Sequence, residues 1–134
     1  MKRLNPAETK LLICVWHPFT LWRPPADVGI SVQRAFPEMK VVHLTTYEHI
    51  NDELPDTDIF VGYSLKPAQF VAAKKLKWLH STAAGVDQLM YPELRTSDVL
   101  VTNASGVHSV PMAEHILGLL IALARRFPSS FRHQ

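Results

Sequence analysis

The amino-acid sequence predicts a doubly wound α/β fold built on a parallel sheet. Short apolar runs alternate with longer amphipathic segments, and Pro, Gly, Asp or Asn separates one from the next. Alternation of strands and helices at this spacing favours a parallel sheet with helices on both faces. Five of the runs have strand character, which favours the flavodoxin-like strand order 2-1-3-4-5. A long C-terminal helix follows the fifth strand.

The five expected strands are short apolar runs at residues 11–16, 41–44, 59–61, 78–80 and 99–102. The expected helices cover residues 24–36, 47–54, 67–75 and 110–126. Pro24 and Pro25 suit the first turn of the first helix, and Pro55 ends the second, which is weak. The third carries apolar side chains at inward spacings, namely Phe70, Val71 and Leu76. The fourth is the longest and the most apolar.

Composition and charge exclude several classes of function. The 134 residues are 47% hydrophobic and 19% charged, as in a globular domain. A net charge of +2 without a long basic run argues against nucleic-acid binding. The longest apolar stretch, residues 116–124, is shorter than the roughly 20 residues that span a bilayer, and no signal peptide is evident. We therefore expect a cytoplasmic protein with no membrane partner. The single Cys14 is expected to be a small buried hydrophobe.

The loops that follow the strands are the expected binding region, because ligands of such sheets bind outside the carboxyl ends of the strands. Residues 81–87, STAAGVD, form one of these loops. Small residues followed by Gly let a backbone pass close to a ligand. A short helix beginning near Val86 or Asp87 would add the partial positive charge that a carboxylate prefers. A tight strand–helix connection without any ligand would have the same composition.

Three sequence blocks in the second half of the chain occur in a specific order. They are LKWLHSTAAGVD at residues 76–87, VTNASG at 101–106 and HSVPMAEHILGLLIALAR at 108–125. Together they resemble the D-isomer-specific 2-hydroxyacid dehydrogenases. In that family an AGVD-type loop and a V-x-N-x-x-G turn each follow a strand, and P-[VIM]-A-E opens a long helix that crosses to a nucleotide-binding domain. The first 75 residues match only in their strand–helix pattern.

The resemblance implies a site for the carboxylate of a small 2-keto or 2-hydroxy acid. Its backbone N–H donors fall on Ala83, Ala84, Gly85 and Val86. Asp87 is assigned to helix capping. Tyr63, in the loop after the third strand, either contacts the substrate or covers the end of the sheet.

The resemblance also divides the chain into a substrate-binding domain, residues 1–106, and a crossing helix with its tail, residues 107–134. It implies positions near the domain junction or the cofactor for Asn103, His108, Val110, Met112 and Glu114. Met112 stands where Val or Ile is commoner, a mild change in an apolar role. Glu114 is expected to act as a hinge or dipole partner rather than as an acid catalyst.

No catalytic residue is assigned, because the family's catalytic Arg, Glu and His belong to sequence beyond this chain. His17 is expected to be a surface or loop-packing residue. No metal site is expected, since there is no H-E-x-x-H motif and neither Cys nor carboxylates cluster with His. The resemblance implies NAD or NADP in the intact enzyme. The chain has no G-x-G-x-x-G motif, so we expect it to hold no cofactor and to be inactive when isolated.

The last helix is expected to need a further partner. Residues 116–124 are apolar all the way round, and one neighbouring surface cannot bury such a helix. The sequence therefore predicts an exposed apolar strip, or a homodimer or other self-association that covers it.

A different class of protein is also compatible with the sequence: a free-standing flavodoxin-like module that binds a small carboxylate or has a regulatory role. A phosphorylated receiver domain is excluded, because Trp16, His17 and Pro18 follow the first strand where an acidic pair is required. A flavin carrier would need a Ser/Thr/Gly-rich loop there. A binding module would still use Ala83, Ala84, Gly85 and Val86. Neither the identity of the acid nor NAD against NADP is decided by the sequence.

Overall fold

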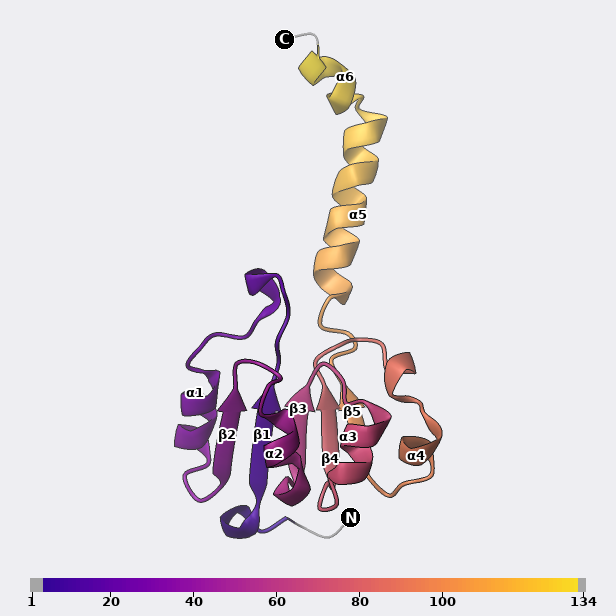
Figure 1. Cartoon of the computed structure of the whole chain (residues 1–134). Coiled ribbons are helices and arrows are strands. Elements are labelled where there is room, and N and C mark those ends of the chain that lie inside the picture. The colour runs from indigo at the N-terminus through magenta and orange to yellow at the C-terminus, as the bar shows by residue number, and fades with distance from the viewer. Residues whose placement is uncertain (1–3, 133–134) are drawn as a thin grey trace. The chain divides into compact units, whose positions relative to one another are not determined.

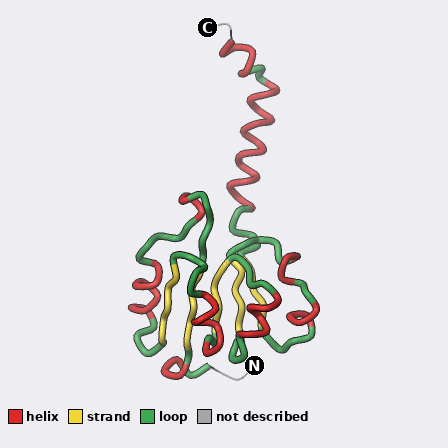
Figure 2. Tube along the Cα trace, viewed as in Figure 1, coloured by secondary structure: helices red, strands yellow, loops and turns green. Residues whose placement is uncertain are grey.

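The computed structural model describes residues 4–132, which form two compact units. The described residues up to Ala104 form the first unit, which contains the whole sheet, and those from Ser105 form the second, which is helical (Figures 1 and 2). The candidate binding loop belongs to the first unit.

Five parallel strands form the sheet in the order β2-β1-β3-β4-β5, which confirms the predicted fold class and strand order. The strands are β1 (Lys10–Cys14), β2 (Lys40–Leu44), β3 (Ile59–Gly62), β4 (Trp78–Ser81) and β5 (Leu100–Asn103). The register sets Gly62 opposite Ser81 and Ser81 opposite Asn103. The last residues of three neighbouring strands therefore lie side by side, and the loops that follow them begin at one edge.

The sheet carries a hydrophobic core on each face, because successive strand residues point to opposite sides. One core contains Leu12, Cys14, Phe60 and Leu79, and is covered by α2 (Ile50–Glu53), α3 (Pro67–Ala72) and α4 (Pro92–Arg95). The other contains Leu11, Ile13 and Ile59, against which α1 (Val28–Ala35) packs Val28 and Val32. Every residue of β1 is buried, which explains why its sequence is continuously apolar after Lys10. The prediction that Cys14 is a buried hydrophobe is confirmed.

Two predicted helix boundaries at proline residues are wrong. The first helix begins at Val28 rather than at Pro24. A proline pushes the preceding residue into extended backbone, so Pro25 keeps Pro24 out of the helix, and Arg23 before them is extended as well. Pro55 does not end the second helical segment, because it lies in the first turn of the 3-10 helix Leu54–Asp56 that continues α2. Proline is tolerated there, since the first N–H groups of a helix have no partner.

The third helix is shorter than predicted and faces the core with fewer residues. It ends at Ala72, and Val71 is 60% exposed instead of pointing inward. Phe70 packs against the core and Leu76, beyond the helix, is buried. Several short elements were not predicted: the 3-10 helices Pro6–Glu8 and Thr20–Trp22, and the helices α4 and α6 (Phe127–Arg132).

The second unit consists of α5 (Ser109–Ala124) followed by α6. Gly106, with φ of 88°, adopts the left-handed conformation just before α5, and Arg126, with φ of 56°, separates the two helices. Apolar side chains are exposed around α5, among them Ile116, Leu117, Leu120, Ile121 and Leu123. Within residues 4–132, no helix is both long enough and apolar enough to cross a membrane.

A buried ammonium group lies at the amino end of β1. The Lys10 side chain is 6% exposed; its Nζ donates to the Glu53 carbonyl oxygen at 2.8 Å and is 2.7 Å from the Glu53 carboxylate. Asp56 also pairs with this Nζ. The Lys10 backbone N–H donates to Asp58, whose other carboxylate oxygen accepts from Lys77. These contacts tie β1 to the segment between α2 and β3, at the end of the sheet opposite the candidate site.

Candidate functional site

The loop at residues 81–87 is fixed to its neighbours on both sides by hydrogen bonds. Ser81, fully buried at the end of β4, donates its hydroxyl to the Tyr63 carbonyl oxygen at 3.0 Å and accepts from the Ala83 N–H at 3.2 Å. The Thr82 N–H donates to the Gly62 carbonyl at 2.9 Å. These bonds attach the start of the loop to the β3 side.

On the β5 side, the carbonyl oxygens of the 81–87 loop accept hydrogen bonds from residues at the end of β5 and just after it. The Ala104 N–H donates to the Ala83 carbonyl at 3.1 Å, and the Asn103 side-chain amide donates to the Ala84 carbonyl at 2.6 Å. Asn103 thus connects the loops that follow β4 and β5. Its predicted place at a junction with another domain stays a prediction.

The backbone N–H groups of Ala84, Gly85 and Val86 donate no hydrogen bond to any described residue. Ala84 and Gly85 are exposed, and Val86 is partly exposed. Three consecutive donors in the described part of the chain therefore remain available to a ligand. Ala83, the fourth predicted donor, is already bonded to Ser81. The loop therefore has the donors that a carboxylate requires, on a backbone held in place by its neighbours.

The short helix expected to begin near Val86 or Asp87 does begin at Asp87, but it is a 3-10 helix of three residues, Asp87–Leu89. A helix of this length is too short to develop the partial positive charge that was expected at its start. Asp87 is not a cap: it is the first residue of that helix, Val86 takes the capping position, and no side chain caps the end. Any anion bound here would be held by individual N–H groups.

Gly85 leaves the loop open on one side. A Cβ atom built on Gly85 would find only the Asp87 Oδ2, 4.0 Å away, within contact range, and the residue has no positive φ. Neither the loop conformation nor packing within the protein therefore requires glycine here. Gly62 differs, since a Cβ there would lie 2.6 Å from the Cys14 carbonyl oxygen. Gly62 serves the close packing of β3 on β1, and Gly85 leaves open space.

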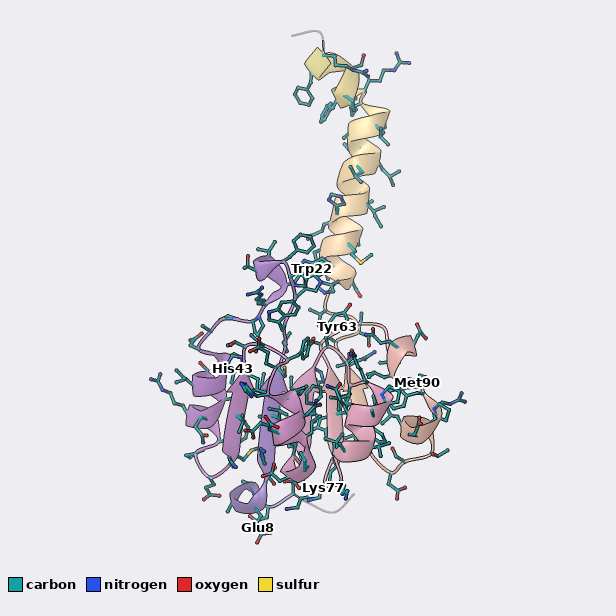
Figure 3. All side chains as sticks on the ribbon, viewed as in Figure 1. Glu8, Trp22, His43, Tyr63, Lys77 and Met90 are labelled. Carbon is teal, nitrogen blue, oxygen red and sulfur yellow. The ribbon has the colours of Figure 1, made fainter. Side chains whose placement is uncertain are left out.

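Tyr63 lies at the same edge, directly after β3, and is 41% exposed. Figure 3 shows it at the end of the sheet from which the Trp22 loop also extends. The two alternative roles of Tyr63, substrate contact or cover for the sheet end, stay predictions. Sequence reasoning missed two aromatic neighbours: Trp16 and Tyr47 form an edge-to-face pair with ring centroids 6.0 Å apart. Each follows a strand within a few residues, which was the available signal.

Burial shapes the protonation of this region. The pKa of Tyr47 is raised by burial and by the nearby Cys14 and Tyr63, although a backbone hydrogen bond from Trp16 opposes the shift. Burial raises the pKa of the Cys14 thiol to about 11. Both groups are therefore neutral at physiological pH, and the edge of the sheet around them carries no negative charge from either side chain.

The remaining predicted positions lie in or beside α5. His108 precedes the helix without capping it through its side chain, and Val110 and Met112 are 66% and 60% exposed. Glu114 is also exposed. Their predicted places near a cofactor stay predictions. His17 packs within its own loop as predicted, against Phe19 and Trp22 at centroid distances of 5.5 and 4.4 Å.

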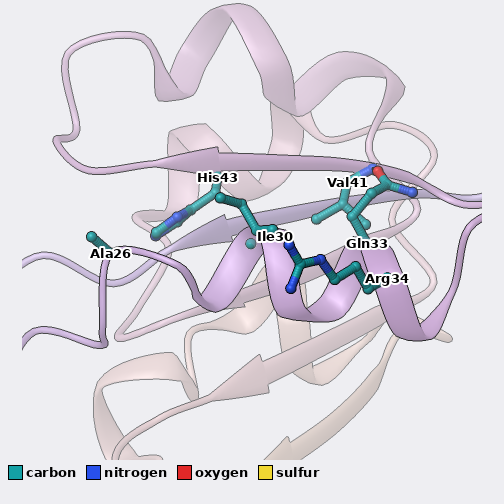
Figure 4. A pocket seen from close by; sticks show the side chains of 7 residues that line it. Ala26, Ile30, Gln33, Arg34, Val41 and His43 are labelled. Carbon is teal, nitrogen blue, oxygen red and sulfur yellow. The ribbon is translucent and has the colours of Figure 1, made fainter.

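A metal site and a pocket were also considered as alternatives to the 81–87 loop. Among residues 4–132, no group of three or more His, Cys, Asp or Glu side chains is arranged to hold a metal ion. A pocket of about 340 Å³ lies between α1 and β2 and is lined by residues such as Gln33, Arg34 and His43 (Figure 4). Since β1 and β3 separate β2 from β4, this pocket is not part of the 81–87 loop.

The fold and the loop define a class: an α/β domain that presents free backbone donors at the carboxyl edge of a parallel sheet. A model of the family described as D-isomer specific 2-hydroxyacid dehydrogenase, catalytic domain, matches residues 21–122. The chain belongs to this family. The match includes the loop, the turn after β5 and most of α5, where the resemblance was seen in the sequence.

Individual relatives are more distant and much longer. The chain is 26% identical over 110 residues to the D-3-phosphoglycerate dehydrogenase of Methanocaldococcus jannaschii, covering 80% of this chain and 21% of that protein. It is 26% identical over 135 aligned positions to the Synechocystis sp. enzyme of the same name, covering 95% and 24%. A third, from Archaeoglobus fulgidus, is 34% identical over 61 residues, covering 46% and 12%. The chain thus spans less than a quarter of the length of these relatives.

Proposed function

We propose that this chain supplies the substrate-carboxylate site of an oxidoreductase that interconverts D-2-hydroxy acids and 2-keto acids with NAD or NADP. The observation that carries the proposal is the row of unpaired N–H groups on Ala84, Gly85 and Val86. Neutral donors of this kind leave a carboxylate charged and fix its orientation, so the neighbouring carbonyl carbon is presented in one direction. Membership of the family supports this assignment.

We assign no nucleotide site to the chain's own residues. Its five glycines, Gly29, Gly62, Gly85, Gly106 and Gly118, are far apart in the sequence and form no G-x-G-x-x-G motif. A bound nicotinamide would supply or accept the hydride. We assign the nicotinamide site, and the acid–base residues of the reaction, to a separate part of a longer protein. In this picture the protein acts in the cytoplasm, and the 134 residues bind the acid without turning it over.

Titration of the chain with D-glycerate, followed by amide NMR, tests the proposal. We expect the Ala84, Gly85 and Val86 amide resonances to shift in a saturable way, while those of the buried strand β1 do not. Gly85→Ala should weaken binding, because the added methyl group would occupy the open space beside the donors without disturbing the fold. Gly118→Ala, which also adds a Cβ in open space but lies in α5, is the matched control and should bind like the parent chain.

Two results would contradict the proposal. Unchanged Ala84–Val86 resonances at saturating acid would remove the carboxylate site. Nicotinamide-dependent reduction of glyoxylate by the purified 134 residues would show that the chain contains the catalytic groups that the proposal assigns elsewhere.

A further inference from the structure

The walls of the pocket between α1 and β2 are fixed to each other (Figure 4). Gly29 of α1 is buried against β2, where an added Cβ atom would lie 2.6 Å from the His43 Cβ. The Gln33 side chain accepts a hydrogen bond from the Val41 N–H at 3.2 Å and donates to the Met39 carbonyl oxygen at 2.9 Å. The volume of about 340 Å³ lies within the range of small-molecule sites. Walls held in this way lose little further freedom when a ligand enters.

Two polar side chains of this pocket have no partner within the described chain. Neither the Arg34 guanidinium nor the His43 ring forms a hydrogen bond or an ion pair with any of residues 4–132. In that same part of the chain, no aspartate or glutamate lines the pocket. A guanidinium carries a positive charge and presents its N–H groups as a planar set of donors. The charge and the donors together favour an anion.

The rest of the lining is mainly apolar. Ala26 precedes α1, Ile30 lies on α1 and Val41 lies on β2, and the Ile30 side chain is 56% exposed. A ligand with a hydrocarbon body would cover these side chains and remove apolar surface from water. A phosphate group would not, since its hydration is stronger than one arginine in an apolar setting can replace. The lining therefore favours a singly charged anion with an apolar body.

We propose that the α1–β2 pocket binds a small carboxylate that carries an apolar ring or chain. Arg34 pairs with the carboxylate, His43 offers a further donor from its ring, and the apolar side chains of the lining contact the body of the ligand. This site is separate from the 81–87 loop, because β1 and β3 lie between β2 and β4 in the sheet. The inference therefore does not depend on the proposed function.

Benzoate tests the site, because it joins one carboxylate to an apolar ring. Added to the 134-residue chain, it should shift the amide resonances of Gly29, Ile30 and His43, the pocket amides, in a saturable way and raise the melting temperature. Benzyl alcohol keeps the ring without the charge, and acetate keeps the charge without the ring. Each should bind at least about tenfold more weakly than benzoate, because each makes only one of the two kinds of contact.

Three variants separate the two kinds of contact. Arg34→Gln should weaken benzoate binding about tenfold and leave benzyl alcohol binding unchanged, because it removes the charge and keeps the apolar wall. Ile30→Ala should weaken the binding of benzoate and benzyl alcohol but not that of acetate. Arg95→Gln makes the same change in net charge at an exposed arginine of α4, on the other face of the sheet, and should bind benzoate like the parent chain.

Three results would overturn the inference. Unchanged pocket amides at high benzoate concentration would remove the site. Equal affinity for benzoate and benzyl alcohol would leave an apolar pocket without an anion site. Equal weakening by Arg34→Gln and Arg95→Gln would show that benzoate responds only to net charge. D-glycerate has no apolar body, so it should shift Ala84–Val86 and leave the pocket amides unchanged; this inference and the proposed function therefore stand or fail separately.

Discussion

Ser81 shows how one buried hydroxyl positions the candidate site. Its Oγ both donates and accepts a hydrogen bond, and in doing so joins the β3 loop to the 81–87 loop. Because the hydroxyl takes up the Ala83 N–H, the next three residues are the ones that keep free donors. A sequence motif can indicate an anion-binding loop, but it does not tell which donors of that loop are used internally.

Tyr91 presents the opposite case, a buried hydroxyl without a partner. Among the described residues, its Oη is the buried side-chain polar atom that has no hydrogen bond. Burial raises the pKa of Tyr91 to about 12. Its ring packs edge-to-face on Phe70, with centroids 5.8 Å apart, so the ring rather than the hydroxyl stabilises the contact between α3 and α4.

Tyr91→Phe should therefore leave the free energy of unfolding unchanged or raise it by up to about 1 kcal/mol, because the desolvation cost of an unpaired hydroxyl disappears. Urea unfolding followed by circular dichroism measures this change. Thr57→Val is the matched control: its fully buried hydroxyl donates to the Glu53 carbonyl oxygen at 2.7 Å, and its removal should cost about 1 kcal/mol. An equal loss in both variants would show that the Tyr91 hydroxyl is bonded, for example to water.

At the scale of the elements, the Lys10 cluster fixes the amino end of β1. Burial alone would lower the pKa of Lys10, but the hydrogen bonds that its ammonium group donates to Asp56 and Glu53 outweigh this effect, and the pKa is raised above 10.5. The Lys10 hydrogen bond lowers the pKa of Asp56 below its usual 3.8. The Asp56 contribution to stability is thus present above pH 3.8 and is lost as the pH falls through its lowered pKa. The Lys10 contribution is present below pH 10.5 and is lost above its raised pKa.

Asp56→Asn should destabilise the chain by about 0.5–1 kcal/mol near neutral pH, a modest amount because Asp56 is half exposed. The difference between the variant and the parent should shrink as the pH is lowered below 3.8. Unfolding in urea across this acidic range measures the effect. A difference that stays constant with pH would mean that the carboxylate charge of Asp56 contributes nothing.

The alternation of apolar runs along the chain predicted the elements of this fold better than single residues such as proline predicted where the helices begin and end. The strand order and all five strands follow from apolar runs, which report burial on both faces of a parallel sheet. Helix ends near proline were missed, because Pro24 and Pro55 each fit two positions and tertiary packing selects between them. Trp16 and Tyr47 were not assigned to the site, since their contact joins loops that are distant in the sequence. The donor loop was found because its contiguous residues resemble a motif of the family, whereas its composition alone also fits an ordinary strand–helix connection.

At the scale of the whole molecule, α5 is the element whose sequence and surroundings agree least. Its apolar side chains are exposed on every side, with Leu123 65% and Leu117 58% exposed. Monomeric proteins rarely present so much contiguous apolar surface to water. We propose that α5 is covered in the functional protein, either by a second copy of the chain in a homodimer or by the part of a longer protein that completes the enzyme.

The isolated chain should accordingly self-associate. Light scattering should give a mass above that of one chain, rising with concentration, and an apolar dye should bind to the fraction that remains monomeric. Replacing Leu120 and Leu123 together by Lys should lower both signals. Leu21→Lys provides the control, since Leu21 is 91% exposed but lies in the loop after β1. A stable monomer with no dye binding at high concentration would contradict the role given to α5.

The buried Cys14 thiol can be used to follow how often the sheet opens. The only thiol in the sequence lies at the end of β1, a strand flanked by β2 and β3, is fully buried and stays protonated at neutral pH. A thiol reagent can therefore reach it only when the sheet opens. The rate at which a reagent labels Cys14 therefore measures how often β1 becomes accessible through opening of the sheet. Slower labelling after addition of an acid would measure how strongly ligand binding at the sheet edge stabilises the folded state.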